Sequence, residues 1–279
     1  MSYSRVAFLT AHVLRLADDP LLAVRVCAAE AVEALLDHAP DSALDAADRL
    51  LAHPDANIHN AITTQRLLIK ALTRAPARFA PHLKRALHAA GATAELAGQS
   101  WAVASLNGYL TNELPATPQD LSAQARRGAA AVFAEHPDRS PFLAGLFEDP
   151  DEQTRTNASQ ALRHVFSLPA PQANDLISAF VDSLAFSADS EHLSFALYEH
   201  TGMLPAIAVD VCERIVRPAG SELGDIRTHR AAEGHYLVSV VLRLYRQSPP
   251  SLRRRCLDLI DMFSQAGAHS LLTALDSER

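Results

Sequence analysis

The sequence predicts an all-α fold: an α-α superhelix of about seven antiparallel helix pairs, forming a single domain over residues 1–279. Three observations predict it. Alanine and leucine dominate the composition and strand-like runs of Val, Ile and Thr are scarce, which favours helix. Apolar residues recur three and four positions apart, as in half-buried helices. One pattern also occurs twice, far apart, which is typical of stacked repeats.

The repeated pattern is "DPLLAVRVCAAEAVEALL" at residues 19–36 and "DPDEQTRTNASQALRHVF" at residues 149–166. The key shared positions are Asp19, Pro20 and Arg25 in the first copy and Asp149, Pro150 and Arg155 in the second. An Asp side chain suits a helix N-cap, and Pro suits the first helical position. We therefore expect this pair to start a helix and the Arg to reach an Asp or a carbonyl of the adjacent repeat. The alanines that follow permit close packing on that repeat.

In the first copy, the expected helix has an apolar face made of Leu21, Val24, Ala28, Val32 and Leu35. The polar residues Arg25, Glu30, Glu33 and Asp37 are expected to lie off this face. Weaker echoes follow. "DLSAQARRGAAAVF" places Asp120, Arg126 and Ala129 at matching offsets, and "HPDANIHNAI" keeps only the proline and an aliphatic-polar pair.

Along the chain, short Pro- and Gly-containing connectors separate the apolar periodic segments and force consecutive helices to lie antiparallel. The longer connectors "NELPATPQD" and "VRPAGSELGD" are candidate bends. The helices are expected at residues 4–16, 20–38, 42–52, 56–74, 77–89, 92–108, 118–135, 138–147, 151–166, 171–186, 190–201, 206–216, 225–247, 250–265 and 268–276.

The Asp-Pro, Val-Arg, Ala-Ala and Ala-Val pieces of residues 19–36, with their echo from Asp149, resemble the HEAT-repeat family. The resemblance covers about half of the chain. It implies an α-solenoid that binds a protein partner, or in some members nucleic acid, along a concave surface.

From residue 225 onward the chain is similar to the C-terminal helical region of bacterial STAND (NACHT-type) ATPases, through its Leu-Arg-Leu-Tyr and Cys-Leu-Asp-Leu-Ile-Asp pieces. Such regions are thought to sense a ligand or partner. The chain contains no Gly-x-x-x-x-Gly-Lys-Ser/Thr phosphate loop, so the resemblance implies a recognition part of a regulatory or defence system rather than the ATPase.

Basic residues gather in the segment 56–94, which contains no acidic residue. Arg66, Lys70 and Arg74 are spaced by four and therefore share one helix face, and Arg78 follows. We call these four residues the basic ridge. Either they pair with acidic residues of neighbouring helices, for which Asp45, Asp48 and Glu95 are candidates, or they bind an anionic partner.

A second basic cluster comprises Arg227, Arg230, Arg243, Arg246, Arg253, Arg254 and Arg255. Solvated helix ends are the simpler interpretation of this cluster. The net charge of −7 argues against a chain that coats nucleic acid non-specifically.

Thirteen histidines raise the question of a metal. His192 and His200 are eight residues apart, and His229 and Glu233 alone make only one i, i+4 pair, so no metal site is predicted. The three cysteines, Cys27, Cys212 and Cys256, are expected to be buried thiols in a reducing cytosol. Trp101 is expected to pack in the core.

No signal peptide or apolar run of about 20 residues is evident, so the sequence predicts a cytoplasmic chain without a membrane partner. No cofactor or catalytic group is predicted. The expected role is a non-enzymatic scaffold that recognises a protein partner, for which an acidic surface is one candidate. The alternative is a nucleic-acid-binding solenoid that uses residues 56–94, and a metallohydroxylase or other enzyme is a third class.

Overall fold

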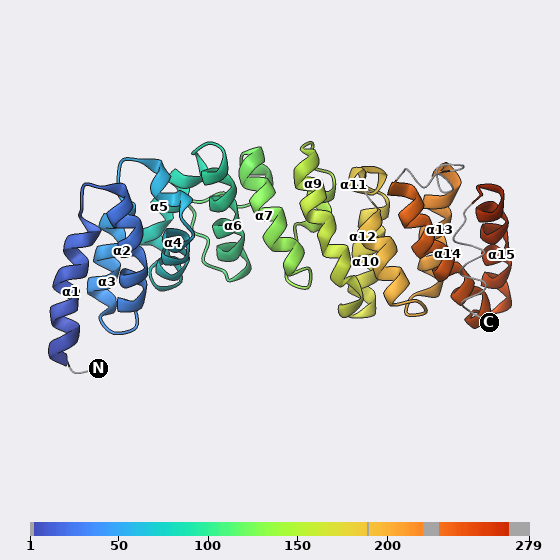
Figure 1. The fold of residues 1–279 in the computed structure, drawn as a ribbon, viewed down its shortest axis with the longest axis horizontal. Helices are drawn as coiled ribbons and strands as arrows, with labels where there is room; N and C mark the ends of the chain where they lie inside the picture. The colour runs from blue at the N-terminus through green and yellow to red at the C-terminus, as the bar shows by residue number, and fades with distance from the viewer. Residues whose placement is uncertain (1–2, 189, 220–228, 268–279) are drawn as a thin grey trace. The chain divides into compact units, whose positions relative to one another are not determined.

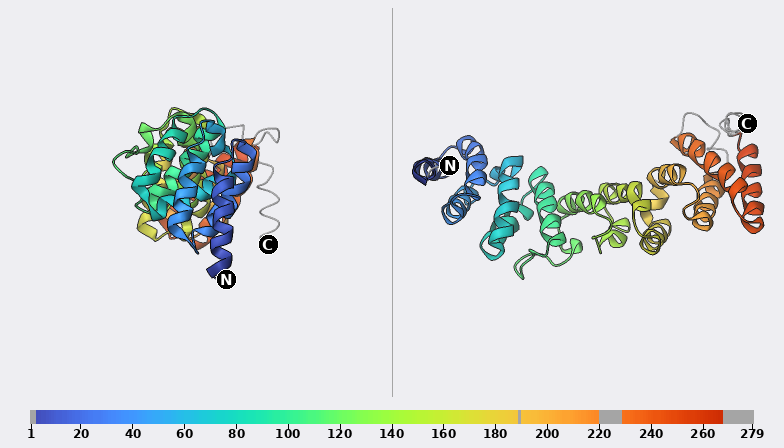
Figure 2. Two further views of the ribbon diagram at one scale, coloured as in Figure 1. Left: turned by 90° about the vertical axis from the view of Figure 1, so that its left-hand side faces the viewer. Right: turned by 90° about the horizontal axis from the view of Figure 1, so that it is seen from below.

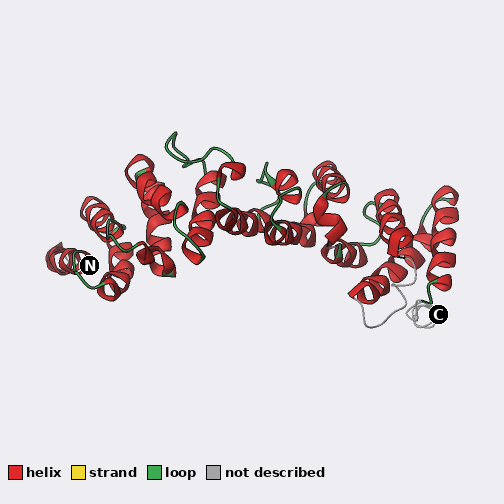
Figure 3. Ribbon diagram, turned by 90° about the horizontal axis from the view of Figure 1, so that it is seen from above, coloured by secondary structure: helices red, strands yellow, loops and turns green. Residues whose placement is uncertain are grey.

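The computed structural model describes residues 3–188, 190–219 and 229–267. Within these ranges the chain forms helices, turns and loops and contains no strand (Figure 3), which confirms the all-α class. None of the helices in these ranges has the length and apolar character that crossing a bilayer requires. The predicted helix 268–276 lies outside the described residues.

Contacts between residues divide the chain into two compact units, residues 1–133 and 134–279, each described below by itself. The prediction of a single domain stays a prediction. Unit 1 contains α1 (Tyr3–Ala17), α2 (Leu22–Leu35), α3 (Pro40–Leu51), η1 (Ala56–Asn60), α4 (Ile62–Arg74), α5 (Pro76–Leu87), α6 (Ala92–Leu106) and η2 (Pro118–Asp120), and α7 (Ala123–Glu135) begins in it.

In unit 1, each helix from α1 to α6 packs on the next, and α1 also packs on α3, α2 on α4 and α4 on α6 (Figure 1). Helices α2, α4 and α6 form one layer, whereas α3 packs on α1 and α2 on the other side. The right-hand view of Figure 2 shows these blue and green helices following one another in the order of the sequence. The core between the layers is rich in alanine and leucine, with Phe79 and Trp101 fully buried, so the prediction for Trp101 is confirmed.

Helices α6 and α7 meet backbone to backbone at two glycines. A Cβ added at Gly98 would lie 1.9 Å from the carbonyl oxygen of Ala125, and one added at Gly128 would lie 1.8 Å from that of Glu95. Only glycine leaves room for this reciprocal contact. Beside it, the rings of Trp101 and Phe133 pack edge to face at 6.0 Å.

Unit 2 contains α8 (Leu143–Phe147), α9 (Glu152–Ser159), η3 (Gln160–Ser167), α10 (Ala170–Val181), α11 (Leu184–Ala188), α12 (Glu191–Glu199), α13 (Pro205–Ala219), α14 (His229–Gln247) and α15 (Pro250–Gln265). Helices η3, α12 and α14 pack side by side in one layer. Helices α8, α10 and α11 pack on α9 and η3, and α13 and α15 pack on α14.

Several predicted helices are interrupted or shortened in the structure; the predicted helix 151–166, for example, changes from α9 to the 3-10 helix η3 at Gln160. The predicted helix 56–74 is interrupted at Ala61, whose backbone is extended, so η1 and α4 are separate. The predicted helix 118–135 becomes η2 and α7, and residues 138–142 do not join α8. The predicted helix 171–186 is interrupted at Ser183, whose amide and hydroxyl both donate to the carbonyl of Phe180 (3.0 Å and 2.6 Å).

The thiols of Cys212 and Cys256 are buried as predicted, whereas Cys27 is exposed. Cys27 follows the half-buried Val26 on α2 and faces away from the seam that Ala28 and Ala29 bury. Burial raises the pKa of the Cys212 thiol, which keeps it protonated and a poor nucleophile at neutral pH.

Candidate interaction surfaces

The basic ridge lies on the outer faces of α4 and α5, and carboxylates of neighbouring helices neutralise it. Arg66 Nη2 and Lys70 Nζ both contact Glu33 Oε1, at 2.8 Å and 2.6 Å. Arg74 Nη2 pairs with Asp37 (2.7 Å), and its Nη1 donates to the carbonyl of Leu36 (2.6 Å). These contacts tie the face of α4 to the C-terminal part of α2.

Glu33 holds the two cations from a buried position, since only 3% of its surface is exposed. Burial alone would raise the pKa of its carboxyl, but hydrogen bonds from Lys70 and Arg66 outweigh burial and lower the pKa below its ordinary value. Glu33 is therefore ionised at neutral pH, although the helical periodicity predicts that it lies off the buried face. That prediction was wrong because α4 covers this side of α2 as well.

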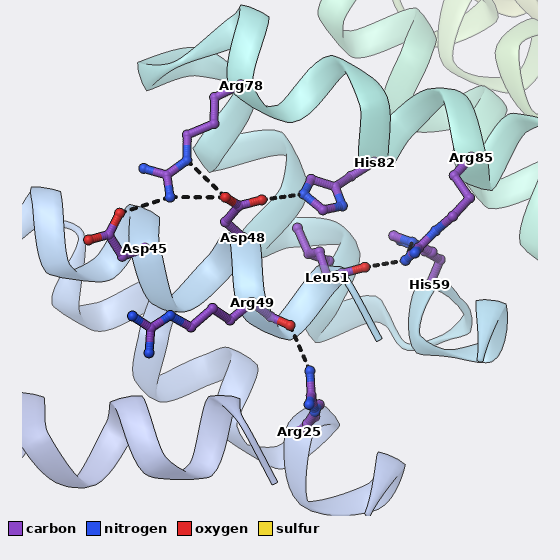
Figure 4. Close-up of polar contacts among 9 residues, drawn as sticks. All are labelled: Arg25, Asp45, Asp48, Arg49, Leu51, His59, Arg78, His82 and Arg85. Carbon is purple, nitrogen blue, oxygen red and sulfur yellow. Dashed lines mark hydrogen bonds and ion pairs between the residues drawn. The ribbon is translucent and has the colours of Figure 1, made fainter. Parts of the chain in front are cut away.

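A second group of contacts joins α3 to α5 (Figure 4). Arg78 Nη2 contacts Asp45 Oδ1 (2.8 Å) and Asp48 Oδ2 (3.0 Å), and His82 Nε2 lies 2.6 Å from Asp48 Oδ1. Burial would raise the pKa of Asp48, but hydrogen bonds from His82 and Arg78 lower it. The alternative of internal pairing thus holds for Asp45 and Asp48. Glu95, the third candidate, forms no ion pair with the described residues, and Glu33 and Asp37 take part instead.

Arg85 has no carboxylate partner among the described residues. Its Nη2 donates to the carbonyl of Leu51 and lies 3.3 Å from His59 Nε2 (Figure 4). His59 is 2% exposed, and burial together with the charge of Arg85 lowers its pKa to about 4, so the ring is neutral. Its Nε2 must accept from Arg85, and the proton lies on Nδ1.

The repeated Asp-Pro pattern forms the same turn in both copies. Asp19 Oδ1 accepts from the amide of Leu21 (2.8 Å), and Asp149 Oδ1 accepts from that of Asp151 (2.9 Å). Neither Asp caps a helix as predicted. α2 begins at Leu22, two residues after Pro20, and α9 begins at Glu152, two residues after Pro150, with Asp151 as the capping side chain. The acidic side chain stabilises the turn that precedes each helix.

The Arg of each copy closes this turn. Arg25 Nε donates to the carbonyl of Asp19 (2.6 Å), and Arg155 Nη1 donates to that of Asp149 (2.7 Å). Arg25 Nη1 also reaches the carbonyl of Arg49 on α3 (2.6 Å; Figure 4), as expected for a bond to a neighbouring helix. Arg155 stays within its own turn, where its second contact is the carbonyl of Pro150 (3.2 Å).

The third, weaker copy keeps only part of this arrangement. Arg126 Nη1 donates to the carbonyl of Leu121 (2.7 Å), not to Asp120, whose side chain accepts from the hydroxyl of Thr117 (2.9 Å).

In unit 2, sequence reasoning missed a cluster of aromatic side chains on two helices of one layer. Phe195 and Tyr198 of α12 contact Tyr236 of α14, with ring centroids 5.4 Å and 5.5 Å apart. The guanidinium of Arg243 lies 5.0 Å from the centre of the Tyr198 ring. Phe195 is 38% exposed. We call Phe195, Tyr198, Tyr236 and Arg243 the aromatic cluster. Its members are 41 residues apart at the Phe195–Tyr236 contact, so only the packing of α12 on α14 brings them together.

Other residues of the second basic cluster have separate roles. Arg255 contacts Glu213 (2.8 Å) and Asp210, and Arg253 Nε donates to the carbonyl of Ser248 (2.8 Å). The side chains of Arg227 and Arg230 lie outside the described residues. Internal pairing, rather than solvation alone, therefore accounts for Arg255.

The histidines considered as ligands do not converge in the part of the chain whose side chains are described. His192 Nδ1 accepts from Arg163 Nε (3.1 Å), and His200 packs against Phe166. The side chain of His229 lies outside the described residues. No group of three His, Cys, Asp or Glu side chains within the described ranges is arranged to hold a metal ion.

Comparison with known proteins adds no family assignment. No protein-family model matches the sequence, and no curated protein sequence matches it significantly. The resemblances to HEAT repeats and to STAND-type regions therefore rest on the residues quoted for them.

Proposed function

We propose that the chain is a non-enzymatic recognition protein that binds a protein partner through the outer face of one helix layer. In this proposal the repeats form a HEAT-like solenoid of about seven helix pairs. The observation that carries the proposal is the aromatic cluster, because it places the exposed ring of Phe195 beside half-buried tyrosine rings on two adjacent helices of the layer made by η3, α12 and α14.

The chemistry of the cluster fits a protein partner. Tyr, Phe and Arg are enriched in protein interfaces, where a few aromatic and arginine side chains carry most of the binding energy. The rings of Phe195 and Tyr236 meet edge to face, with an interplanar angle of 77°, so the cluster is already ordered before a partner arrives. A preformed surface loses less side-chain entropy on binding.

Binding of nucleic acid is the alternative, and the basic ridge gives it less support than the sequence did. All four ridge residues contact carboxylates of the same unit, which lowers the positive potential available to phosphates. In the aromatic cluster, Arg243 covers one face of the Tyr198 ring, and that face is no longer available for stacking on a base.

A quantitative pull-down with a matched control tests the proposal. The bait proteins are the wild type, the double variant Phe195→Ala/Tyr236→Ala, and the control Leu257→Ala, which removes a 45%-exposed apolar side chain of α15. We expect at least one protein from the source cells to be retained by the wild type and the control but depleted about tenfold with the double variant. Its affinity for the wild-type protein is then measured with both components purified.

Two results would contradict the proposal. One is that no retained protein depends on the cluster. The other is binding of a labelled DNA duplex by the wild type at low salt that weakens steeply as salt is added, which would support the alternative. Salt dependence is the cleaner test, because replacing Arg66 or Lys70 also removes the partners of the buried Glu33.

A further inference from the structure

A pocket of about 400 Å³ lies in unit 1 between the C-terminal turn of α5 and the long connection from α6 to α7, residues 107–122. Pockets of about 300–1,000 Å³ are the usual size of small-molecule sites. This connection includes the "NELPATPQD" segment, for which the sequence predicts only a candidate bend. Ordered connections longer than about 12 residues commonly carry a function.

The connection is held firmly as one wall of the pocket. The indole Nε1 of Trp101 on α6 donates to the carbonyl of Pro115 (3.0 Å), and Arg126 of α7 donates to the carbonyl of Leu121 (2.7 Å). Pro115 and Leu121 both line the pocket. Its wall is therefore anchored to two helices.

The pocket carries opposite charges on different walls and an apolar floor. Lys84 comes from α5 and Glu113 from the connection, and both side chains are exposed. Their side chains form no ion pair with each other, and neither side chain has a hydrogen bond or ion pair with any other described residue. Asp120 also lines the pocket, but its carboxylate already accepts from the hydroxyl of Thr117 (2.9 Å). The floor consists of leucines that are 4–6% exposed, among them Leu114 and Leu121.

From this arrangement we propose that the pocket binds a small zwitterion with an apolar body, namely a free amino acid or a short peptide. Its carboxylate contacts Lys84, its ammonium group contacts Glu113, and its apolar side chains cover Leu114 and Leu121. A simple anion is attracted by Lys84 but repelled by Glu113, and a simple cation is attracted by Glu113 but repelled by Lys84. Only a dipolar ligand is therefore attracted by both side chains. This site is independent of the aromatic cluster and of the function proposed above.

Trp101 is the only tryptophan of the chain, and its indole is bonded to a residue of the pocket wall, so its fluorescence reports on the pocket. The probe is the dipeptide leucyl-leucine, titrated into the full chain while Trp101 emission and binding heat are recorded. We expect saturable binding. The N-acetylated and the C-amidated dipeptide each lack one charge and should bind about tenfold more weakly.

Two variants assign the charges. Lys84→Gln should weaken binding of leucyl-leucine about tenfold but leave the affinity for the C-amidated dipeptide unchanged, and Glu113→Gln should behave in the same way toward the N-acetylated form. Both side chains are exposed, so the far-UV circular dichroism spectrum should be that of the wild type. The control Glu30→Gln removes an exposed charge on α2 and should bind like the wild type.

The proposal is overturned if leucyl-leucine produces no saturable signal in the millimolar range. It is also overturned if the C-amidated dipeptide binds as tightly as the free dipeptide, because the carboxylate would then not be recognised. A third contradicting result is that Glu113→Gln has no effect on binding while Lys84→Gln weakens it, because the site would then be one for anions alone.

Discussion

The two copies of the repeated pattern, residues 19–36 and 149–166, share a turn and a buried seam but continue as different helices. Buried residues stand at equal offsets in both, such as Ala28 and Ala158, or Val32 and Leu162. The first copy continues as the α-helix α2 to Leu35, whereas the second changes from α9 to the 3-10 helix η3 at Gln160.

The copies differ most at the offset of Glu33, which in the second copy is Arg163. Both residues bind the next helix of their layer: Glu33 accepts from Arg66 and Lys70 of α4, and Arg163 donates to His192 of α12. The position is thus a polar link between helices in both units, with opposite charge and different burial. The turn is encoded locally, whereas the link depends on the residue that the neighbouring helix supplies.

Exchanging these charges should give the largest effect. Glu33→Arg places a cation in a nearly buried site beside Arg66 and Lys70, and we expect unit 1 to lose about 3–5 kcal/mol of stability. Arg163→Glu changes an exposed side chain and should cost less than about 1 kcal/mol. Urea unfolding with hydrogen exchange of α2, α4 and η3 measures both. Equal losses of stability would show that the burial of Glu33 does not make its link stronger than that of the exposed Arg163.

Removing the arginine that closes each turn should give the next largest effect. Arg25→Ala breaks bonds to Asp19 and to Arg49 of another helix, and we expect a loss of about 1.5–3 kcal/mol. Arg155→Ala breaks bonds only within its own turn and should cost less. The measurement is the same unfolding series. A larger loss for Arg155→Ala would contradict the idea that bonding across helices distinguishes the first copy.

Replacing the aspartate of each turn should cost more stability in the second copy than in the first, which is the opposite order to that of the arginines. Asp149 is 5% exposed and Asp19 is half-buried, so an unsatisfied amide is harder to hydrate in the second copy. We expect Asp149→Ala to cost about 1–2 kcal/mol and Asp19→Ala about 0.5–1 kcal/mol. Asn at each position retains the acceptor oxygen and is the control that should restore most of the loss.

Acid should weaken the ion pairs of Glu33 with Arg66 and Lys70, with a smaller loss of stability than the substitutions above. The pKa of Glu33 is lowered from its ordinary value of 4.5, so its contribution is full above that value and is lost as the pH falls through the lower folded value. The pKa of Asp48 is likewise lowered from its ordinary value of 3.8, so its contribution to stability is lost as the pH falls below that value. The link of Arg163 to His192 contains no carboxylate. Between pH 5 and pH 3, the amide protection factors measured by hydrogen exchange should fall first in α2, α4 and α5. Unchanged protection factors there would contradict this expectation.

The sequence was sufficient where a local rule determines the structure. Helical periodicity predicted the all-α class, and the repeat pattern predicted that Asp19, Arg25 and their counterparts belong to one structural motif. The start of α2 was misplaced because an Asp-Pro pair suits a turn before a helix as well as a cap. The partners Glu33 and Asp37, and the rings of the aromatic cluster, depend on which helices stack together, and no local pattern contains that information.

The close packing of Gly98 on Ala125 and of Gly128 on Glu95 also affects a second site, further along α6. The same helix carries Trp101, one turn further on, and the indole of Trp101 holds Pro115 in the pocket wall. A methyl group introduced at either glycine would act as a spacer between α6 and α7 and would shift that anchor as well. The absence of two side chains therefore supports the position of a pocket wall to which neither glycine belongs.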